Sequence, residues 1–140
     1  MEDIRGVVFS LDENTIQRGI KEDKDVIANY TRKKKLKPGM DLYLYSSGDE
    51  TPRKIVARAE IEKVERMKPN SVEEKYSDRL FPKKEEFKEY TKNRRNKEML
   101  VLTLNNLIRL NDPVNPPGNM TVAGLYIDEG RYKRLKNKMK

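Results

Sequence analysis

The chain has 140 residues and a formal net charge of +8 at pH 7, and 39% of its residues are charged against 35% that are hydrophobic. It contains neither cysteine nor histidine, which excludes disulfides, thiol nucleophiles, iron–sulfur clusters, the usual zinc sites and serine–histidine catalysis. The basic balance favours anionic partners, nucleic acid first.

The N-terminal part of the chain predicts a strand, a helix and a second strand. Residues 5–9 form a short apolar run that is typical of a strand. Ser10 and Glu13 have the spacing of a capping box, so we expect a helix that begins there and ends at about Ile20. Residues 26–30 alternate between two faces, which predicts the next strand.

The most informative stretch lies between residues 36 and 64. Residues 37–39 read Lys-Pro-Gly, in which proline presets φ and glycine tolerates the positive φ of a type II turn. Residues 40–46 and 55–62 then alternate with period two on either side of a polar loop, and this predicts a β-hairpin. Ala57 and Ala59 are poor strand formers on the inward face, so we expect a crowded interior such as that of a small barrel.

The composition changes at residue 68, where two helices are predicted. A second capping box predicts a helix from Ser71 to about Arg79. Pro82 suits the first turn of another helix, in which Phe87 and Tyr90 have the spacing of a buried stripe.

The C-terminal part predicts the strands that complete the fold. Residues 99–104 are strongly apolar, and residues 107–110 extend the same strand through a bulge. Residues 111–119 contain three prolines and predict a loop, residues 122–127 predict a last strand, and a short helix should follow Asp128.

This order of elements predicts one domain over residues 1–140. It divides into a strand-helix-strand-hairpin part (1–67), a helical insertion (68–98), and closing strands with a terminal helix (99–140). The order lacks βαβ alternation, so the expected class is α+β, mainly β, with helices at the sides of a small mixed barrel. No apolar run approaches ~20 residues and the N-terminus lacks a secretory pattern, so we expect a cytoplasmic protein with no membrane partner. Abundant lysine and glutamate are also typical of thermophilic proteins.

Several stretches resemble known proteins. The turn and strand of residues 36–46 and the strand of residues 55–61 resemble the PUA-like superfamily, and the ASCH-type branch most closely. Residues 76–81, 94–95 and 122–127 look like signatures of an uncharacterised archaeal family within that superfamily. The resemblance implies a PUA-like pseudobarrel and a role around RNA or modified nucleosides, and it does not imply a known reaction.

Proteins of the ASCH type carry a G-x-K-x-x-E-x-R pattern, which this chain does not preserve. If Lys24 is the lysine, Ile27 stands in place of the acid; in the register that begins at Gly19, Lys24 itself stands there. Some relatives use lysine, threonine and glutamate to hydrolyse an amide on modified cytidine. A hydrolase or nuclease would here depend on Lys24 with a carboxylate from elsewhere, such as Glu60 or Glu98.

Basic and aromatic residues supply the candidate nucleic-acid interface. Cations interleaved with tyrosines are typical of single-strand recognition, although a solvated loop, a tyrosine under a helix and arginines at a helix end are structural alternatives. The candidates for RNA or modified-nucleotide binding are Tyr30, Arg32, Lys33, Lys34, Lys35, Tyr45, Arg94, Arg95 and Tyr126. The resemblance also implies a pocket at the barrel mouth, for which the candidates are Ser46, Thr121 and Gly124; close strand packing would explain Gly124 equally well.

The sequence predicts no metal site and no cofactor. Glu22, Asp23 and Asp25 form an acidic group, but Lys21 and Lys24 flank it, and this favours a solvated loop over a magnesium site. We therefore expect a non-catalytic RNA- or modified-nucleotide-binding module. A hydrolase and a protein-interaction domain remain the alternatives.

Overall fold

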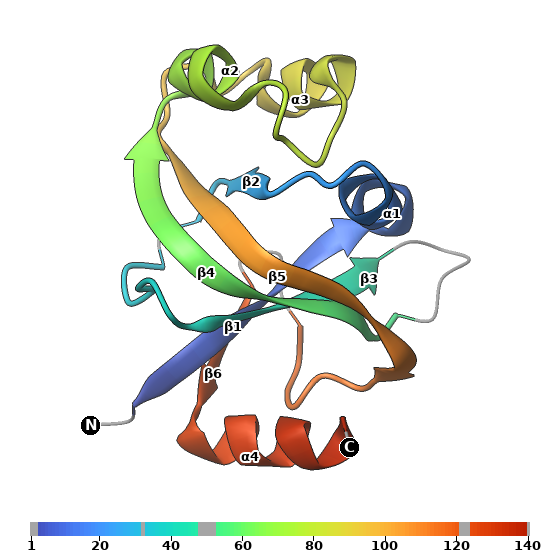
Figure 1. Cartoon of the computed structure of the whole chain (residues 1–140). Coiled ribbons are helices and arrows are strands. Elements are labelled where there is room, and N and C mark those ends of the chain that lie inside the picture. The colour runs from blue at the N-terminus through green and yellow to red at the C-terminus, as the bar shows by residue number, and fades with distance from the viewer. Residues whose placement is uncertain (1–2, 32, 48–52, 121–123, 140) are drawn as a thin grey trace.

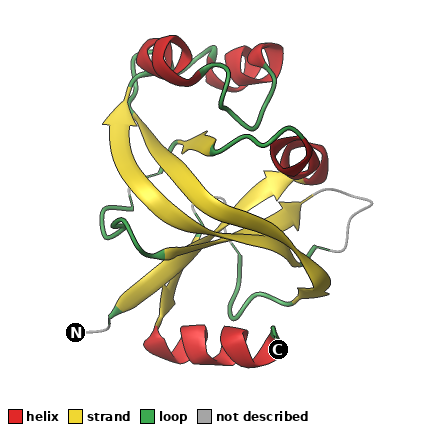
Figure 2. Cartoon of the chain, viewed as in Figure 1, coloured by secondary structure: helices red, strands yellow, loops and turns green. Residues whose placement is uncertain are grey.

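The computed structural model describes residues 3–31, 33–47, 53–120 and 124–139. Its strands form one strongly curved sheet, and the helices lie at its ends and side (Figures 1 and 2). The elements are, in chain order, β1 (Ile4–Asp12), α1 (Glu13–Lys21), β2 (Val26–Asn29), β3 (Asp41–Ser47), β4 (Ile55–Met67), α2 (Pro69–Tyr76), α3 (Lys84–Thr91), β5 (Met99–Val114), β6 (Leu125–Asp128) and α4 (Glu129–Lys138).

The sheet is mixed, with strand order β2-β5-β4-β3-β1-β6. β1 and β3 pair in parallel, and the other neighbouring strands pair antiparallel. Helices α2 and α3 cover one end of the curled sheet and α4 covers the opposite end (Figure 1). The predicted class, a mixed β pseudobarrel with flanking helices, is confirmed.

The hairpin predicted between residues 40 and 62 is the antiparallel pair β3–β4. Gly39 has a φ of 94°, as the turn required. Ala57 pairs with Leu44 and is 0% exposed, and Ala59 pairs with Leu42 and is 3% exposed. The small residues therefore lie where the curl of the sheet brings large side chains together.

β5 continues through a bulge, as predicted. Asn106 has a φ of 54°, and the pairing with β4 shifts between the pairs Glu60–Asn105 and Arg58–Ile108. The strand then runs on to Val114, so the loop predicted from residue 111 begins too early. The pairing with β4 is irregular again over this last part of the strand. Pro113, which has no backbone N–H to donate, is tolerated there because the regular ladder is interrupted.

Both predicted capping boxes are wrong. Ser10 remains within β1, because the ladder with β3 continues to Asp12. Asp12 is the N-cap of α1 instead, and its carboxylate accepts a 3.1 Å hydrogen bond from the backbone N–H of Asn14. The next helix begins at Pro69, so that Ser71 lies inside its first turn.

The described residues of the core form three packed clusters. The interior of the curled sheet is filled by residues such as Phe9, Leu44 and Leu102. A second cluster around Val72 lies under α2 and α3, and a third around Leu135 lies under α4. Among the described residues, no helix has the length and apolar character needed to cross a bilayer.

Candidate nucleic-acid interface

A cleft opens where the end of β1 meets β2 and α3, and we call it the mouth cleft. Its volume is about 310 Å³, which is within the range of small-ligand sites. Its lining residues come from the junction between β1 and α1, from β2, from α3 and from the segment that precedes α3. Apolar Ile27, Phe81 and Phe87 line it together with polar Ser10, Asp12, Thr15, Asn29 and Tyr90.

Two tyrosines and an arginine are packed together at the edge of this cleft, and we call them the tyrosine–arginine cluster (Tyr30, Tyr90 and Arg94). The guanidinium carbon of Arg94 lies 4.2 Å from the ring centroid of Tyr30 and 4.7 Å from that of Tyr90. The two ring centroids are 5.6 Å apart. These distances are those of cation–π and aromatic contacts.

Hydrogen bonds hold this cluster in one geometry. The Tyr30 hydroxyl donates to the carbonyl of Arg94 at 2.9 Å, and the Arg94 guanidinium donates to the carbonyl of Tyr90 at 2.7 Å. The Tyr90 hydroxyl donates to Oδ1 of Asn29 at 3.1 Å. Burial raises the pKa of Tyr30 above its ordinary value. The Tyr30 hydroxyl therefore acts as a neutral donor at pH 7.

Tyr90 does not belong to a buried stripe, which corrects the prediction. Phe87 is 2% exposed and packs on the core, whereas Tyr90 is 42% exposed. The next turn of α3 passes beyond the core and leaves the ring of Tyr90 over Asn29. One face of the ring contacts Arg94, and the residue lines the mouth cleft.

Thr31 and residues 33–37, here called the basic loop, lie between β2 and β3, which are not neighbours in the sheet. Arg66 of β4 donates to the carbonyls of Thr31 and Lys33 at 3.0 and 2.6 Å. On the other side, the backbone N–H of Lys35 donates to the Tyr126 hydroxyl of β6 at 3.1 Å. The loop follows β2 and reaches β6, which are the two edge strands of the sheet. It therefore closes the curled sheet into a pseudobarrel.

The basic loop brings together several of the predicted cations. Lys33 Nζ lies 4.4 Å from the ring centroid of Tyr126, and burial lowers the pKa of Lys33. The side chains of Lys34, Lys35 and Lys37 are exposed and line a cleft of about 550 Å³ together with Arg5. None of these three lysines makes an ion pair within the described part of the chain. Arg32 lies outside the described residues.

Arg94 and Arg95 are adjacent in sequence but have different surroundings. Arg95 donates to Oγ1 of Thr91 at 2.8 Å, and it also hydrogen-bonds Asn70 and pairs with the carboxylate of Glu73. It thereby ties α2 to the end of α3. Of the two arginines, Arg94 alone belongs to the tyrosine–arginine cluster, and Arg95 has the structural role that was the alternative interpretation.

Tyr45 is not among the residues that line the mouth cleft. It packs with Tyr43 and Leu135 in the cluster under α4. Tyr43 is fully buried, its hydroxyl donates to Oδ2 of Asp41 at 2.9 Å, and burial raises its pKa. The structure thus shows the tyrosine-under-a-helix arrangement for this strand face rather than an open stacking surface.

The predicted pocket residues also have packing roles. Ser46 is 0% exposed within β3. Gly124 has a φ of 90°, and a Cβ added there would lie 2.8 Å from the ring of Phe9. A larger residue would not fit against the sheet at this position. Thr121 lies outside the described residues.

Lys24 is held by a backbone group. Its Nζ donates to the carbonyl of Asp78 at 2.7 Å, which joins the turn after α1 to the turn after α2. The carboxylates of Glu60 and Glu98, which were considered as its partners, make no ion pair with Lys24 and are exposed.

Two carboxylates of the acidic group after α1 pair with different arginines. Asp25 receives two hydrogen bonds from Arg79, at 2.9 and 2.8 Å, and Glu22 pairs with Arg18 at 3.3 Å. Within the described ranges, no three residues of metal-ligating type are arranged to hold an ion.

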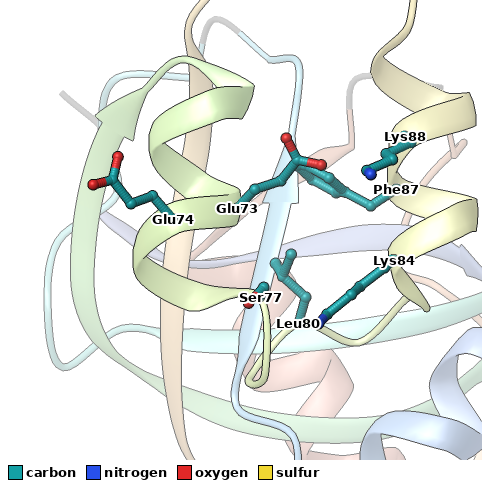
Figure 3. Close-up of a pocket in the computed structure, with 7 residues that line it drawn as sticks. All are labelled: Glu73, Glu74, Ser77, Leu80, Lys84, Phe87 and Lys88. Atoms are coloured by element: carbon teal, nitrogen blue, oxygen red, sulfur yellow. The ribbon is translucent and has the colours of Figure 1, made fainter.

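A shallower groove of about 370 Å³ separates α2 from α3 on the outside of this end of the molecule. Leu80 and Phe87 form its base (Figure 3). Lys84 and Lys88 extend from α3 on one side, Glu73 extends toward them from α2, and Glu74 points away on the far side of α2. Because acidic and basic side chains face each other here, this groove offers no surface of one charge.

Comparison with known proteins gives the family. The sequence profile described as "Domain of unknown function (DUF365)" matches residues 4–129. The chain belongs to this DUF365 family. It is also 30% identical over 110 residues to "Uncharacterized protein MJECS03" of Methanocaldococcus jannaschii, an alignment that covers 71% of this chain and all of that protein.

Solved structures support the fold of this DUF365 chain. The ASCH protein of Zymomonas mobilis superimposes with a TM-score of 0.82 at 12% identity, over 99% of this chain and 98% of that one. A single-substitution variant of the same protein gives 0.81 at 14% identity, over the whole of both chains. The predicted resemblance to the ASCH-type branch of the PUA-like superfamily is confirmed as a likeness of fold.

Sequence reasoning missed two polar residues that line the mouth cleft of this DUF365 chain. Asn29 and Asp12 line it, although neither was considered as a site residue. Their position in the sequence could have indicated this role, because a polar residue at the end of an apolar strand often lies at the edge of a sheet. The helical spacing of Phe87 and Tyr90 predicts a core position for Tyr90 and so gives no sign of its place at the cleft.

Proposed function

We propose that this DUF365 protein is a non-catalytic module that binds single-stranded RNA or a modified nucleotide at the mouth cleft. The observation that carries the proposal is the exposed ring of Tyr90, held on Arg94 at the edge of a cleft that is lined by both apolar and polar side chains. The PUA-like fold of the ASCH neighbours supports it.

The cleft offers a ring on which the face of a nucleobase could stack and polar groups that could hydrogen-bond its edge. Stacking of a base on the open side of a tyrosine ring is worth about 1–3 kcal/mol. Oδ1 of Asn29 accepts from Tyr90, which leaves the amide N–H groups of Asn29 to donate to an acceptor on the base edge. One oxygen of Asp12 caps α1, and the other can accept from an exocyclic amino group.

The phosphates of the strand lie over the basic loop in this proposal. Lys34, Lys35 and Lys37 are exposed and without acidic partners in the described structure, so their charges are available to phosphate. Single-stranded binding of this kind loses affinity with log salt at a slope of about 0.7 per neutralised phosphate.

The test is a fluorescence-anisotropy titration with short labelled RNAs at several salt concentrations. We expect Tyr90→Ala to weaken binding about tenfold, which corresponds to ~1.4 kcal/mol of lost stacking. Tyr90→Phe keeps the ring and should lose much less. The double variant Lys34→Gln/Lys35→Gln should reduce the salt slope by about 1.4, or 0.7 for each of two phosphates.

Two results would contradict this proposal. An RNA affinity that does not change with salt concentration would contradict the proposed RNA interface. An unchanged affinity in the Tyr90→Ala variant would contradict it as well. The non-catalytic part is tested separately with a panel of modified nucleosides. Turnover that disappears in Lys24→Ala would favour the hydrolase alternative.

A further inference from the structure

A second cationic cleft lies at the α4 end of the molecule, and we call it the α4 cleft. Its volume is about 520 Å³. The C-terminal half of α4 forms one side, and residues 108–112 of β5 with Arg58 of β4 form the other. The mouth cleft is bordered by α3, and α3 and α4 lie at opposite ends of the curled sheet (Figure 1).

Basic side chains outnumber acidic ones among the described residues that line the α4 cleft. Lys136 and Lys138 line it from the helix and are exposed; their position near a helix C-terminus by itself has a structural explanation in the helix dipole. Arg58 has no such explanation, because it projects from a strand. It is half-buried, and its guanidinium makes no hydrogen bond or ion pair with any described residue.

Because no described residue hydrogen-bonds the Arg58 guanidinium, its N–H donors are available to a ligand. Arg109, which also lines the cleft, pairs with Glu13. Among the described residues that line the cleft, Asp112 alone is acidic. The arrangement around Arg58 therefore favours an anion with oxygen acceptors.

The floor of the α4 cleft indicates what else the ligand carries. Ile108 is 45% exposed, which is unusual among the large apolar side chains of the described chain. Leu110 and Met139 lie beside it and are half-buried. An inorganic anion would leave this apolar surface uncovered, whereas the base or sugar of a nucleotide would cover it.

Hydrogen-bonding groups separate a nucleotide from an acidic peptide. Asn111 and Asp112 lie beside the cations, and the carboxylate of Asp112 can accept a hydrogen bond from a donor on the ligand. Ribose hydroxyl and exocyclic amino groups are donors, whereas acidic side chains offer only acceptors and would be repelled. Phosphate, apolar surface and donors occur together in a nucleotide.

We propose that the α4 cleft is a second RNA contact, which holds one phosphate of the strand on Arg58, Lys136 and Lys138 and its nucleoside on Ile108. The proposal rests on the proposed function only in taking RNA as the ligand, since the residues involved are separate from the mouth cleft. A strand that reaches both clefts would bind more tightly than one that fills either.

The first experiment is a methyl NMR titration of the full chain with 5′-phosphorylated pentauridylate. We expect the Ile108 δ1 and Met139 ε methyl signals to shift, and the shifts to disappear in Arg58→Gln. Shifts confined to the neighbourhood of Tyr90 would overturn this proposal and leave the proposed function intact. Shifts at Ile108 with none near Tyr90 would support this proposal and count against the mouth cleft.

The second experiment measures affinity for a 20-nucleotide single-stranded RNA by anisotropy. The double variant Lys136→Gln/Lys138→Gln should weaken binding at least fivefold. The matched control Lys133→Gln/Arg134→Gln removes two cations from the same helix that do not line the cleft, and it should weaken binding less than twofold. Circular dichroism confirms that each variant is folded.

Equal losses in the two double variants would mean that α4 contributes only diffuse charge, and this would overturn the proposal. Tighter binding of a glutamate-rich peptide than of RNA, abolished by Arg58→Gln, would identify an acidic protein segment as the occupant and would also overturn it.

Discussion

Replacing Arg95 by glutamine tests whether this residue is a structural tie or a phosphate ligand. Arg95 hydrogen-bonds Thr91 and Asn70 and pairs with Glu73, and the side chains of the ion pair are 32% and 23% exposed. A hydrogen bond to a charged group is worth about 1.5–3 kcal/mol, and solvent screening moves a partly exposed pair toward the lower figure. We therefore expect Arg95→Gln to lower the free energy of unfolding by about 1.5 kcal/mol.

The assay is urea unfolding at pH 7, combined with a thermal melt. A loss of this size should lower the melting temperature by about 5 °C for a chain of this length. Glu73→Gln should cost a similar amount, and the double variant should cost less than the sum of the two, with a coupling of about 1 kcal/mol. Arg94→Gln serves as the matched control, because it should weaken RNA binding more than stability. If Arg95→Gln instead kept its stability and lost RNA affinity, our assignment of Arg95 would be refuted.

Two further predictions concern packing and pH. Gly19→Ala should destabilise the protein by about 1–3 kcal/mol, because the added Cβ would lie 2.4 Å from the ring of Phe81. Gly118→Ala is the control, because a Cβ there would have more room. Equal urea midpoints for the two variants would contradict this packing argument. The Tyr76 hydroxyl lowers the pKa of Glu65 below its ordinary 4.5, so this contribution is present above about pH 4.5 and is lost as the pH falls through the lowered pKa. Tyr76→Phe should therefore cost about 1 kcal/mol at pH 7, with a difference from the parent that shrinks in acid; a pH-independent difference in urea unfolding would contradict it.

The sequence alone was enough to predict the elements whose causes are local. The turn that contains Gly39 and the alternation on either side of it predicted the β3–β4 hairpin, and the structure has both. The bulge at Asn106 was predicted from two adjacent asparagines within an apolar strand. Backbone preference and side-chain period act over a few residues, so they can be read directly from the chain.

The spacing of a cap did not predict the first residue of α1 or of α2. Ser10 and Ser71 both have the spacing of a cap, yet neither serves as one. β1 continues through Ser10 because β3 pairs with it, and α2 begins earlier, at Pro69. Pairing with a strand that lies more than thirty residues away overrides a local preference worth about 1 kcal/mol.

The candidate site shows the same division most clearly. Composition and spacing indicated a basic, tyrosine-bearing interface, but they treated Arg94 and Arg95 alike and grouped Tyr45 with Tyr30. The tertiary structure set Arg94 between two tyrosine rings, turned Arg95 to Glu73, and covered Tyr45 with the α4 cluster. Periodicity tells which side chains share a face, whereas the curl of the sheet decides which distant segments meet that face, because those contacts form between residues that local rules do not connect.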